Sequence, residues 1–562
     1  MNILQQSSHS STFYRRSKRW SIDHLKFIGP GIVASVAYLD PGNWATDIEA
    51  GSTYGYPHLF VVLAASLMAI LLQILSTRLG YVTGKDLAQH CRLALYDRPT
   101  HKKLWRWCAL YPLYAICEAG IIFTDLAELI GSAMALKMLF PGLPLYGGVL
   151  LTSLDVFVVL AFFNTYPSAS NKTSTLIFEL LITILVFAVL ISFVILLVKV
   201  SPRWPDVFEG FIPSAGMIKN GALYQAIGII GATVMPHALF LGSKVAILDR
   251  VMWNDDWETR SDDKSPQEDL CDTEMPDNSD STDLHAINRL PAVLSPCQGV
   301  KRRAWNQIDH RMVDNPVDYI HSHLGHASFD IALSLFTLAL PVNAAILIVA
   351  ASAFYYTENE HIVVADLLSA HELLATRIGK GSAYVFAIAL LLSGQAASIT
   401  VTLSGQLVSE GFLKWRTNPV VRRIVTRLIG IVPAAAVAGS VGLKGMDDVL
   451  VGSQVALSLV LPFVIAPLLV FTSNKDTMSV GIDPPETLPP PSSSPKLATS
   501  GNRDDVQSRV VENDHEGPVI SEESKVIPHF ANGKFIVILT SAILVMMCAA
   551  NAYGIIQLAM GR

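Results

Sequence analysis

The sequence carries little charge and few cysteines for its length, and each shortage argues against a class of protein. Only 16% of the 562 residues are charged, whereas soluble domains carry about 25%. The six cysteines are scattered without CxxC or zinc-ligand spacing, which argues against a disulfide framework or a cysteine metal cluster. The chain also has no nucleotide-binding loop, no hydrolase motif and no concentrated basic tract. We therefore expect neither an enzyme, nor an ATP-driven pump, nor a nucleic-acid-binding protein.

Long apolar runs take the place of the missing charge. Hydrophobic residues make up 51% of the chain, and its mean hydropathy is +0.42. Runs of about 20 apolar residues, the length that crosses a bilayer core, recur along the sequence. We predict an all-α polytopic membrane protein embedded in the lipid bilayer, without a cleaved signal peptide. The eleven expected spans lie at roughly 27–50, 58–80, 109–136, 145–163, 174–199, 221–246, 328–355, 382–412, 424–442, 449–472 and 535–557.

Polar stretches divide these spans into groups. An acidic stretch follows span six and a Pro/Ser-rich stretch follows span ten, and neither has the apolar content to bury a core. We expect both to be disordered linkers and candidate binding regions for regulatory partners. The predicted organisation is a polar tail (1–24), spans one to six (25–249), the acidic linker (250–325), spans seven to ten (326–473), the Pro/Ser-rich linker (474–533) and span eleven (534–562).

The distribution of basic residues predicts the orientation of the chain. Lysines and arginines gather after span two (78–106) and after span eight (416–423). Because basic loops stay on the cytosolic side, the N-terminus and both linkers are expected in the cytosol and the C-terminus on the opposite side. The pattern suits either the plasma membrane or an endosomal or vacuolar membrane.

Two spans contain helix-breaking residues at membrane depth. Asp40-Pro41-Gly42-Asn43 interrupts span one, and Met235-Pro236-His237 interrupts span six. Unpaired backbone groups are costly in hydrocarbon unless they line a cavity or face protein. The two breaks are five spans apart, which is typical of transporters built from inverted repeats with a binding site at the breaks. The alternatives are a solvated loop at the first break and an ordinary packed proline kink at the second.

The residues at the breaks suggest a metal site. Asp40 offers a charged oxygen, Asn43 a neutral one, the break before Pro236 frees the Ala232 carbonyl, and Met235 adds a thioether. Soft sulfur beside hard oxygen favours Mn²⁺, Fe²⁺ and similar ions over Mg²⁺ and Ca²⁺. Gln454, at depth in span ten, is expected to join in some states. Met235 as plain apolar packing remains the alternative.

A second set of residues suggests a proton route. His237 lies beside the second break, and imidazole titrates near neutral pH. Glu118, Asp125 and Glu128 share roughly one face of span three, and such intramembrane carboxylates mark ion or proton paths by default. Arg427 in span nine is their candidate cationic partner. A static buried ion-pair network is the alternative interpretation.

These segments together resemble the Nramp family of divalent metal–proton symporters, and most of all its fungal Smf-type members. The two breaks are similar to the paired signature motifs of that family. The likeness covers essentially all spans and extends through further segments at 83–89, 124–131, 394–395, 405–411 and 453–458.

The resemblance implies a LeuT-like fold of two inverted five-helix repeats, with discontinuous helices 1 and 6, plus an eleventh helix. It implies the same metal ligands, proton movement through the same titratable groups and Asp40, and manganese and iron as transported ions, with no bound cofactor. Many members carry a second histidine five residues after the one that matches His237. Gly242 stands at that position here.

Three other functions remain open at this point. The same fold carrying another cargo is disfavoured by Met235, because an organic amine needs no thioether. A transport-inactive metal sensor is disfavoured by the intact ligand set and carboxylate row. A channel would not need a row of proton-titrating groups.

Overall fold

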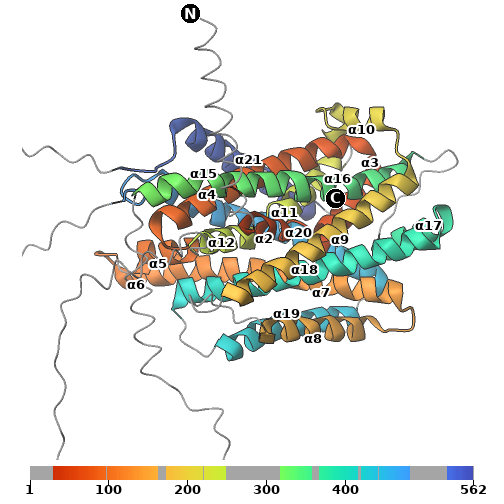
Figure 1. The fold of residues 1–562 in the computed structure, drawn as a ribbon, viewed down its shortest axis with the longest axis horizontal. Helices are drawn as coiled ribbons and strands as arrows, with labels where there is room; N and C mark the ends of the chain where they lie inside the picture. Colours follow the sequence, from red (N-terminus) through yellow and green to blue (C-terminus); the bar gives the residue numbers. More distant parts are fainter. Residues whose placement is uncertain are drawn as a thin grey trace, which may run out of the picture.

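The computed structural model describes residues 24, 29–96, 98–162, 172–218, 221–247, 317–356, 366–414, 419–440, 442–480 and 528–560. These residues form a bundle of helices (Figure 1). An isolated antiparallel β-bridge joins Ser479 and His529. Eight of the described helices are long and apolar enough to cross a membrane. The prediction of an all-α polytopic membrane protein is confirmed.

Each of the eleven predicted spans corresponds to helix. The first is split into α2 (Pro30–Val36) and α3 (Pro41–Tyr54), and the sixth into α11 (Ala222–Thr233) and α12 (Pro236–Val245). The others are α4 (Leu59–Thr83), α7 (Tyr111–Leu139), α8 (Leu145–Phe162), α9 (Lys172–Val200), α15 and α16 (Val317–Ser334 and Leu340–Ala350), α18 (Lys380–Leu413), α19 (Pro419–Ser440), α20 (Gly442–Ser473) and α21 (Lys534–Ala559). Short helices α5 (Leu87–Tyr96), α6 (Lys102–Trp105), α10 (Trp204–Gly210) and α17 (Leu367–Arg377) lie between them.

Helix packing shows the inverted repeat. Helix α7 packs against α18 at the centre, α7 also packs against α20, and α18 in the same way packs against α9. Helices α2 and α3 pack on α15 and α16, as α11 and α12 pack on α4. Helices α8 and α19 lie side by side along one edge (Figure 1). Each of these contacts between two helices corresponds to a contact between the helices five spans away from them in the chain. Because five is odd, the two halves run in opposite directions across the membrane.

The structure also revises one boundary. Helix α15 begins at Val317, whereas the predicted acidic linker runs to 325. His321 and His323 lie in this overlap, and His323 is buried. Most of the two predicted linkers, and nearly all of the N-terminal tail, lie outside the described residues.

Helix α5 begins with a capping box, and a hydrogen bond ties it to the end of α4. The Asp86 carboxylate accepts from the Gln89 N–H (2.9 Å), and the Gln89 side chain accepts from the Asp86 N–H (3.0 Å). His90 follows in the same helix, with its Nε2 2.7 Å from the Thr83 hydroxyl. Burial, with a smaller effect of the Lys85 charge, lowers the pKa of His90 from 6.5 to about 4.

This lowered pKa predicts an acid-sensitive contribution of His90 to stability. The unfolded chain takes up the proton below about pH 6.5, while the folded chain resists it until about pH 4. Stability is therefore full above pH 6.5 and falls as the pH drops toward 4, by about 2 kcal/mol at pH 5. We expect His90→Gln, which can still bond Thr83, to lose less melting temperature between pH 7 and pH 5 than the parent in detergent. Equal losses in both proteins would contradict this.

Candidate functional site

The first break is a short unwound segment held from outside its own helix. After α2, the N–H groups of Ala37, Tyr38 and Leu39 make tight i→i−3 bonds of 3.0–3.2 Å, and regular helix resumes only at Pro41. The Tyr38 carbonyl accepts from the side-chain amides of Asn43 (3.0 Å) and Asn343 (3.2 Å). The Leu39 carbonyl accepts from the Ser393 hydroxyl. Side chains of α16 and α18 thus satisfy carbonyls that the break leaves exposed.

Asp40 caps helix α3 in a fully buried position. Its Oδ2 accepts from the Gly42 N–H (3.0 Å), and its Oδ1 accepts from the backbone N–H (3.2 Å) and the side-chain amide (2.6 Å) of Asn43. A carboxylate at a helix N-terminus is stabilised by these donors and by the helix dipole. The sequence therefore places a buried carboxyl group at the break, held in position by these donors.

The second break mirrors the first. Helix α11 ends at Thr233, Val234 and Met235 have extended backbone angles, and α12 starts at Pro236. Because proline has no N–H, the Ala232 carbonyl lacks its usual helical donor. Ala232 and Met235 are fully buried. Met235 belongs to the same apolar cluster as Tyr38, directly before the first break.

Three helices meet where Asp40, Asn43 and Gln454 lie. The Thr233 hydroxyl of α11 donates to Asn43 Oδ1 (3.4 Å), which joins the two breaks. Gln454 of α20 presses against Gly42: a methyl group at Gly42 would overlap the Gln454 amide and lie 2.6 Å from Asp40 Oδ2. The Gln454 backbone likewise touches Gly231, beside Ala232. The Gln454 Oε1 is buried and has no hydrogen-bond partner among the described residues, so it is available as a ligand.

The predicted carboxylate row follows α7 away from this site. Gly131 contacts the Pro41 ring directly, and Glu128 precedes it by one helical turn. Glu128 and Asp125 are buried, and Glu118 is partly buried. The Asp125 carboxylate lies against Gly430 of α19, one turn from Arg427. The structure thus brings the helix of Arg427 to Asp125, although the Arg427 side chain lies outside the described residues.

His237 sits in the first turn of α12, next to the second break. Its side chain is 1% exposed, and neither ring nitrogen has a hydrogen-bond partner among the described residues. A buried polar ring without partners is costly for stability alone. This arrangement favours a functional over a purely structural histidine.

The place of the family's second histidine is occupied. A Cβ at Gly242 would overlap the side-chain amide of Gln73 on α4. The Gln73 Oε1 accepts from the Tyr38 hydroxyl (3.1 Å). A histidine at 242 therefore does not fit while Gln73 holds this position.

Sequence analysis missed three polar residues at the site. Thr233 and Ser393 bond to the breaks, and Asp47 of α3 is fully buried, with both carboxylate oxygens lacking a hydrogen-bond partner among the described residues. Asp47 follows Asp40 by two helical turns, so helical spacing alone could have placed it on the same face of α3. Nothing in the sequence marks Ser393, because it lies seven spans from the break it supports.

A family comparison decides the identity. The model of the family described as Nramp, natural resistance-associated macrophage protein-like, matches residues 31–275 and 302–481. The chain belongs to the Nramp family. The predicted resemblance is confirmed, and with it the prediction that the chain is a membrane transporter of divalent metal and not an enzyme.

Relatives within the Nramp family include fungal proteins. The chain is 36% identical to the manganese transporter SMF1 of Saccharomyces cerevisiae over 96% of this chain and 86% of the relative. It is 40% identical to the iron transporter SMF3 of the same yeast over 81% and 83%. The fold is similar to a crystal structure of the Eremococcus coleocola manganese transporter, with a TM-score of 0.64 and 25% identity over 94% of this chain and 85% of the other.

Proposed function

We propose that this Nramp protein is a proton-coupled secondary active transporter that imports Mn²⁺, Fe²⁺ and similar divalent transition-metal ions into the cytosol by alternating access. The observation that carries the proposal is the meeting of the two helix breaks, where the buried Asp40 carboxylate faces Asn43, Gln454 and the end of α11. Fungal relatives named as manganese and iron transporters support the choice of ions.

The donors at this place match such cargo. Asp40 supplies one negative charge, and Asn43, Gln454 and the Ala232 carbonyl supply neutral oxygens. Met235 supplies sulfur, which weakly polarisable Mg²⁺ and Ca²⁺ do not favour. A site with one carboxylate also attracts the abundant hard cations Mg²⁺ and Ca²⁺ less strongly than a site with several carboxylates would. We assign these five residues as the metal ligands.

Protons are proposed to travel beside the metal. Asp40 either holds the metal or accepts a proton, so one charge couples the two ions. His237 and the α7 carboxylates (Glu118, Asp125 and Glu128) lie on helices that contact the breaks, and we assign them as the route, with Arg427 as the balancing cation.

Orientation follows from the basic loops. We infer a cytosolic N-terminus and an extracytosolic C-terminus, in the plasma membrane or an endosomal or vacuolar membrane. Half-helices α2 and α12 then lie toward the cytosol, and α3 and α11 lie toward the other side. Hinging at the unwound residues opens one side while the other stays closed.

The test is Mn²⁺ uptake into proteoliposomes with an inward proton gradient. We expect uptake, together with acidification of the lumen, and a fall in uptake when a protonophore collapses the gradient. Protein-free liposomes are the control. Uptake of Mn²⁺ without proton movement would overturn the coupling, and absence of metal uptake would overturn the proposal as a whole.

Met235→Ala is expected to change selectivity more than rate. Mn²⁺ uptake should stay within about threefold of the parent, while discrimination against Ca²⁺ should fall by at least about tenfold, because the sulfur ligand that disfavours hard ions is lost. Uptake of each ion under competition measures this. Met134→Ala in α7 removes an equally buried methionine and should leave selectivity unchanged. If Met235→Ala left selectivity unchanged, Met235 would be assigned to apolar packing and not to metal binding.

A further inference from the structure

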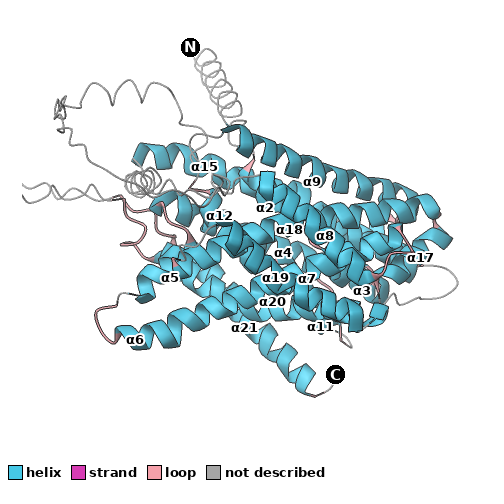
Figure 2. Ribbon diagram, turned by 90° about the horizontal axis from the view of Figure 1, so that it is seen from below, coloured by secondary structure: helices cyan, strands magenta, loops and turns pink. Residues whose placement is uncertain are grey.

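The eleventh helix, α21, touches the bundle along one narrow stripe. Its buried positions are Thr540, Ile543, Met547, Asn551 and Gly554. Their spacing of three and four residues defines one face of a helix. Most other side chains are exposed, as lipid-facing residues are, for example Phe535 at 77%. Helices α20 and α21 lie next to each other (Figure 2).

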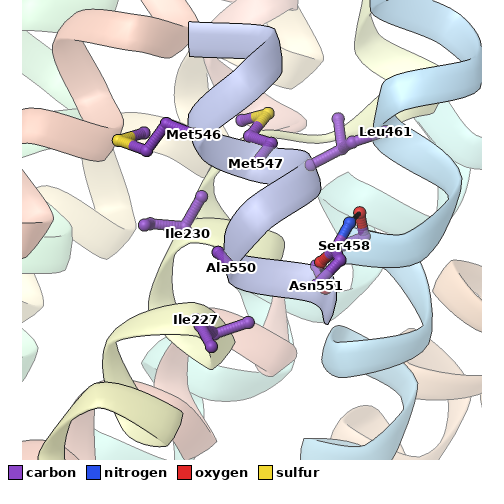
Figure 3. A pocket seen from close by; sticks show the side chains of 8 residues that line it. All are labelled: Ile227, Ile230, Ser458, Leu461, Met546, Met547, Ala550 and Asn551. Atoms are coloured by element: carbon purple, nitrogen blue, oxygen red, sulfur yellow. Dashed lines mark hydrogen bonds between the residues drawn. The ribbon is translucent and has the colours of Figure 1, made fainter. Parts of the chain in front are cut away.

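Asn551 is the amide on this stripe, and it binds α20 through two hydrogen bonds. Its Nδ2 donates to the Ser458 carbonyl (2.6 Å), and its Oδ1 accepts from the Ser458 hydroxyl (2.7 Å). Figure 3 shows the two side chains facing each other at the edge of a small apolar pocket. In hydrocarbon such a polar side chain is costly unless it is paired.

The partner carbonyl is one that helix α20 cannot satisfy by itself. In a regular helix the Ser458 carbonyl would accept from the N–H of residue 462, but that residue is Pro462, inside α20. Asn551 supplies the missing donor from another helix. It therefore stabilises α20 at the turn that Pro462 interrupts and does more than fasten α21 to the bundle.

Ser458 lies one helical turn from the proposed metal ligand Gln454. Gly231 of α11 contacts both the Gln454 carbonyl and Ser458. Helix α21 also reaches α11: a Cβ at Gly554 would lie 4.0 Å from the Ile227 side chain. Ile227 and Ile230 line the same pocket as Met547 (Figure 3). One face of α21 thus contacts both α11, which carries Ala232 in its last turn, and α20, which carries Gln454.

We propose that Asn551 is a positioning residue for metal binding: by satisfying the Ser458 carbonyl it holds the proline-interrupted turn of α20 that sets Gln454 against Gly42. This inference rests on the proposed role of Gln454 as a ligand. It gives the eleventh helix, which lies outside the two repeats, a direct part in the geometry of the site.

The test is a pair of substitutions analysed as a cycle. We expect Asn551→Leu to raise the KM for Mn²⁺ by about tenfold, the order of one interhelical hydrogen bond, with the maximal rate within about twofold. Pro462→Ala restores a backbone N–H that can satisfy Ser458 within α20. In the Pro462→Ala background, Asn551→Leu should therefore change the KM by less than about twofold.

Control variants separate this role from simple anchoring. Val545→Leu, at an exposed position of the same helix outside the pocket, should leave the KM unchanged. If Asn551→Leu lowers the melting temperature but leaves the KM unchanged, or if its effect on the KM is the same with Pro462 and with Ala at 462, the inference is overturned.

Gln454→Ala distinguishes this failure from failure of the proposed site. A raised KM in Gln454→Ala with an unchanged KM in Asn551→Leu would overturn the positioning role alone. An unchanged KM in Gln454→Ala would remove the ligand that Asn551 is proposed to position, and would overturn both.

Discussion

Asp40→Asn should fold like the parent and lose Mn²⁺ uptake by at least about a hundredfold, beyond the effect typical of residues that only support metal ligands. Asparagine caps helices as well as aspartate does, so its one side-chain oxygen can still accept from an N–H group at the start of α3. The substitution removes the negative charge and one of the two acceptor oxygens that Asp40 uses. That charge both attracts the metal and accepts the proton, and the neighbouring ligands Asn43 and Gln454 are neutral and cannot replace it.

Uptake and thermal stability should be measured together for this variant. We expect a melting temperature close to that of the parent with transport lost. Asp40→Ala removes the cap as well and should also lose about 1 kcal/mol of stability. Asp366→Asn, at the cap of α17 where Asp366 accepts from the Ser369 N–H, is the matched control and should transport normally. Normal uptake in Asp40→Asn would refute the assignment of the metal site.

Gly131→Ala should have the second largest effect. A Cβ at this position would overlap the Pro41 ring and lie 2.6 Å from its Cγ. Neither side can yield easily, because Gly131 lies in the middle of α7 and the Pro41 ring is rigid and directly follows Asp40. We expect uptake to fall at least tenfold and stability to fall by about 1–3 kcal/mol, the usual cost of overpacking.

The control for this variant is another helical glycine. Gly452 lies in α20, and a Cβ there would meet nothing within 4 Å. Gly452→Ala should therefore transport normally and be as stable as the parent or slightly more so. If Gly131→Ala kept full uptake and stability, the close contact between α7 and the first break would not be needed for transport. That result would argue against the proposed proton route from Asp40 to the α7 carboxylates.

Much of the site could be predicted locally because proline and aspartate act on their own backbone. Pro41 and Pro236 lack the N–H that continues a helix, so both breaks are visible in the sequence. Asp40 caps the helix that starts one residue later, which is a contact within three residues. The length of apolar runs likewise predicted the eleven spans, since the bilayer sets the length of a crossing helix. The start of α15 was less visible, because its buried histidines look like those of a polar loop.

Other features depend on contacts between residues far apart in the chain, which no local pattern records. The Tyr38 and Leu39 carbonyls take donors from Asn343 and Ser393, about 300 and 350 residues away, and only the packed helices bring these side chains to the break. Gln73 fills the space at Gly242 for the same reason.

The sequence by itself determined where the helices break and which donors stand at each break, because these follow from proline geometry, capping and the hydrophobic length of a span. The tertiary structure decided that the two breaks face each other, that Gln454 closes the site against Gly42, and that Asn551 of the last helix supports it through Ser458. These contacts join separate helices, and close packing in the membrane interior selects them.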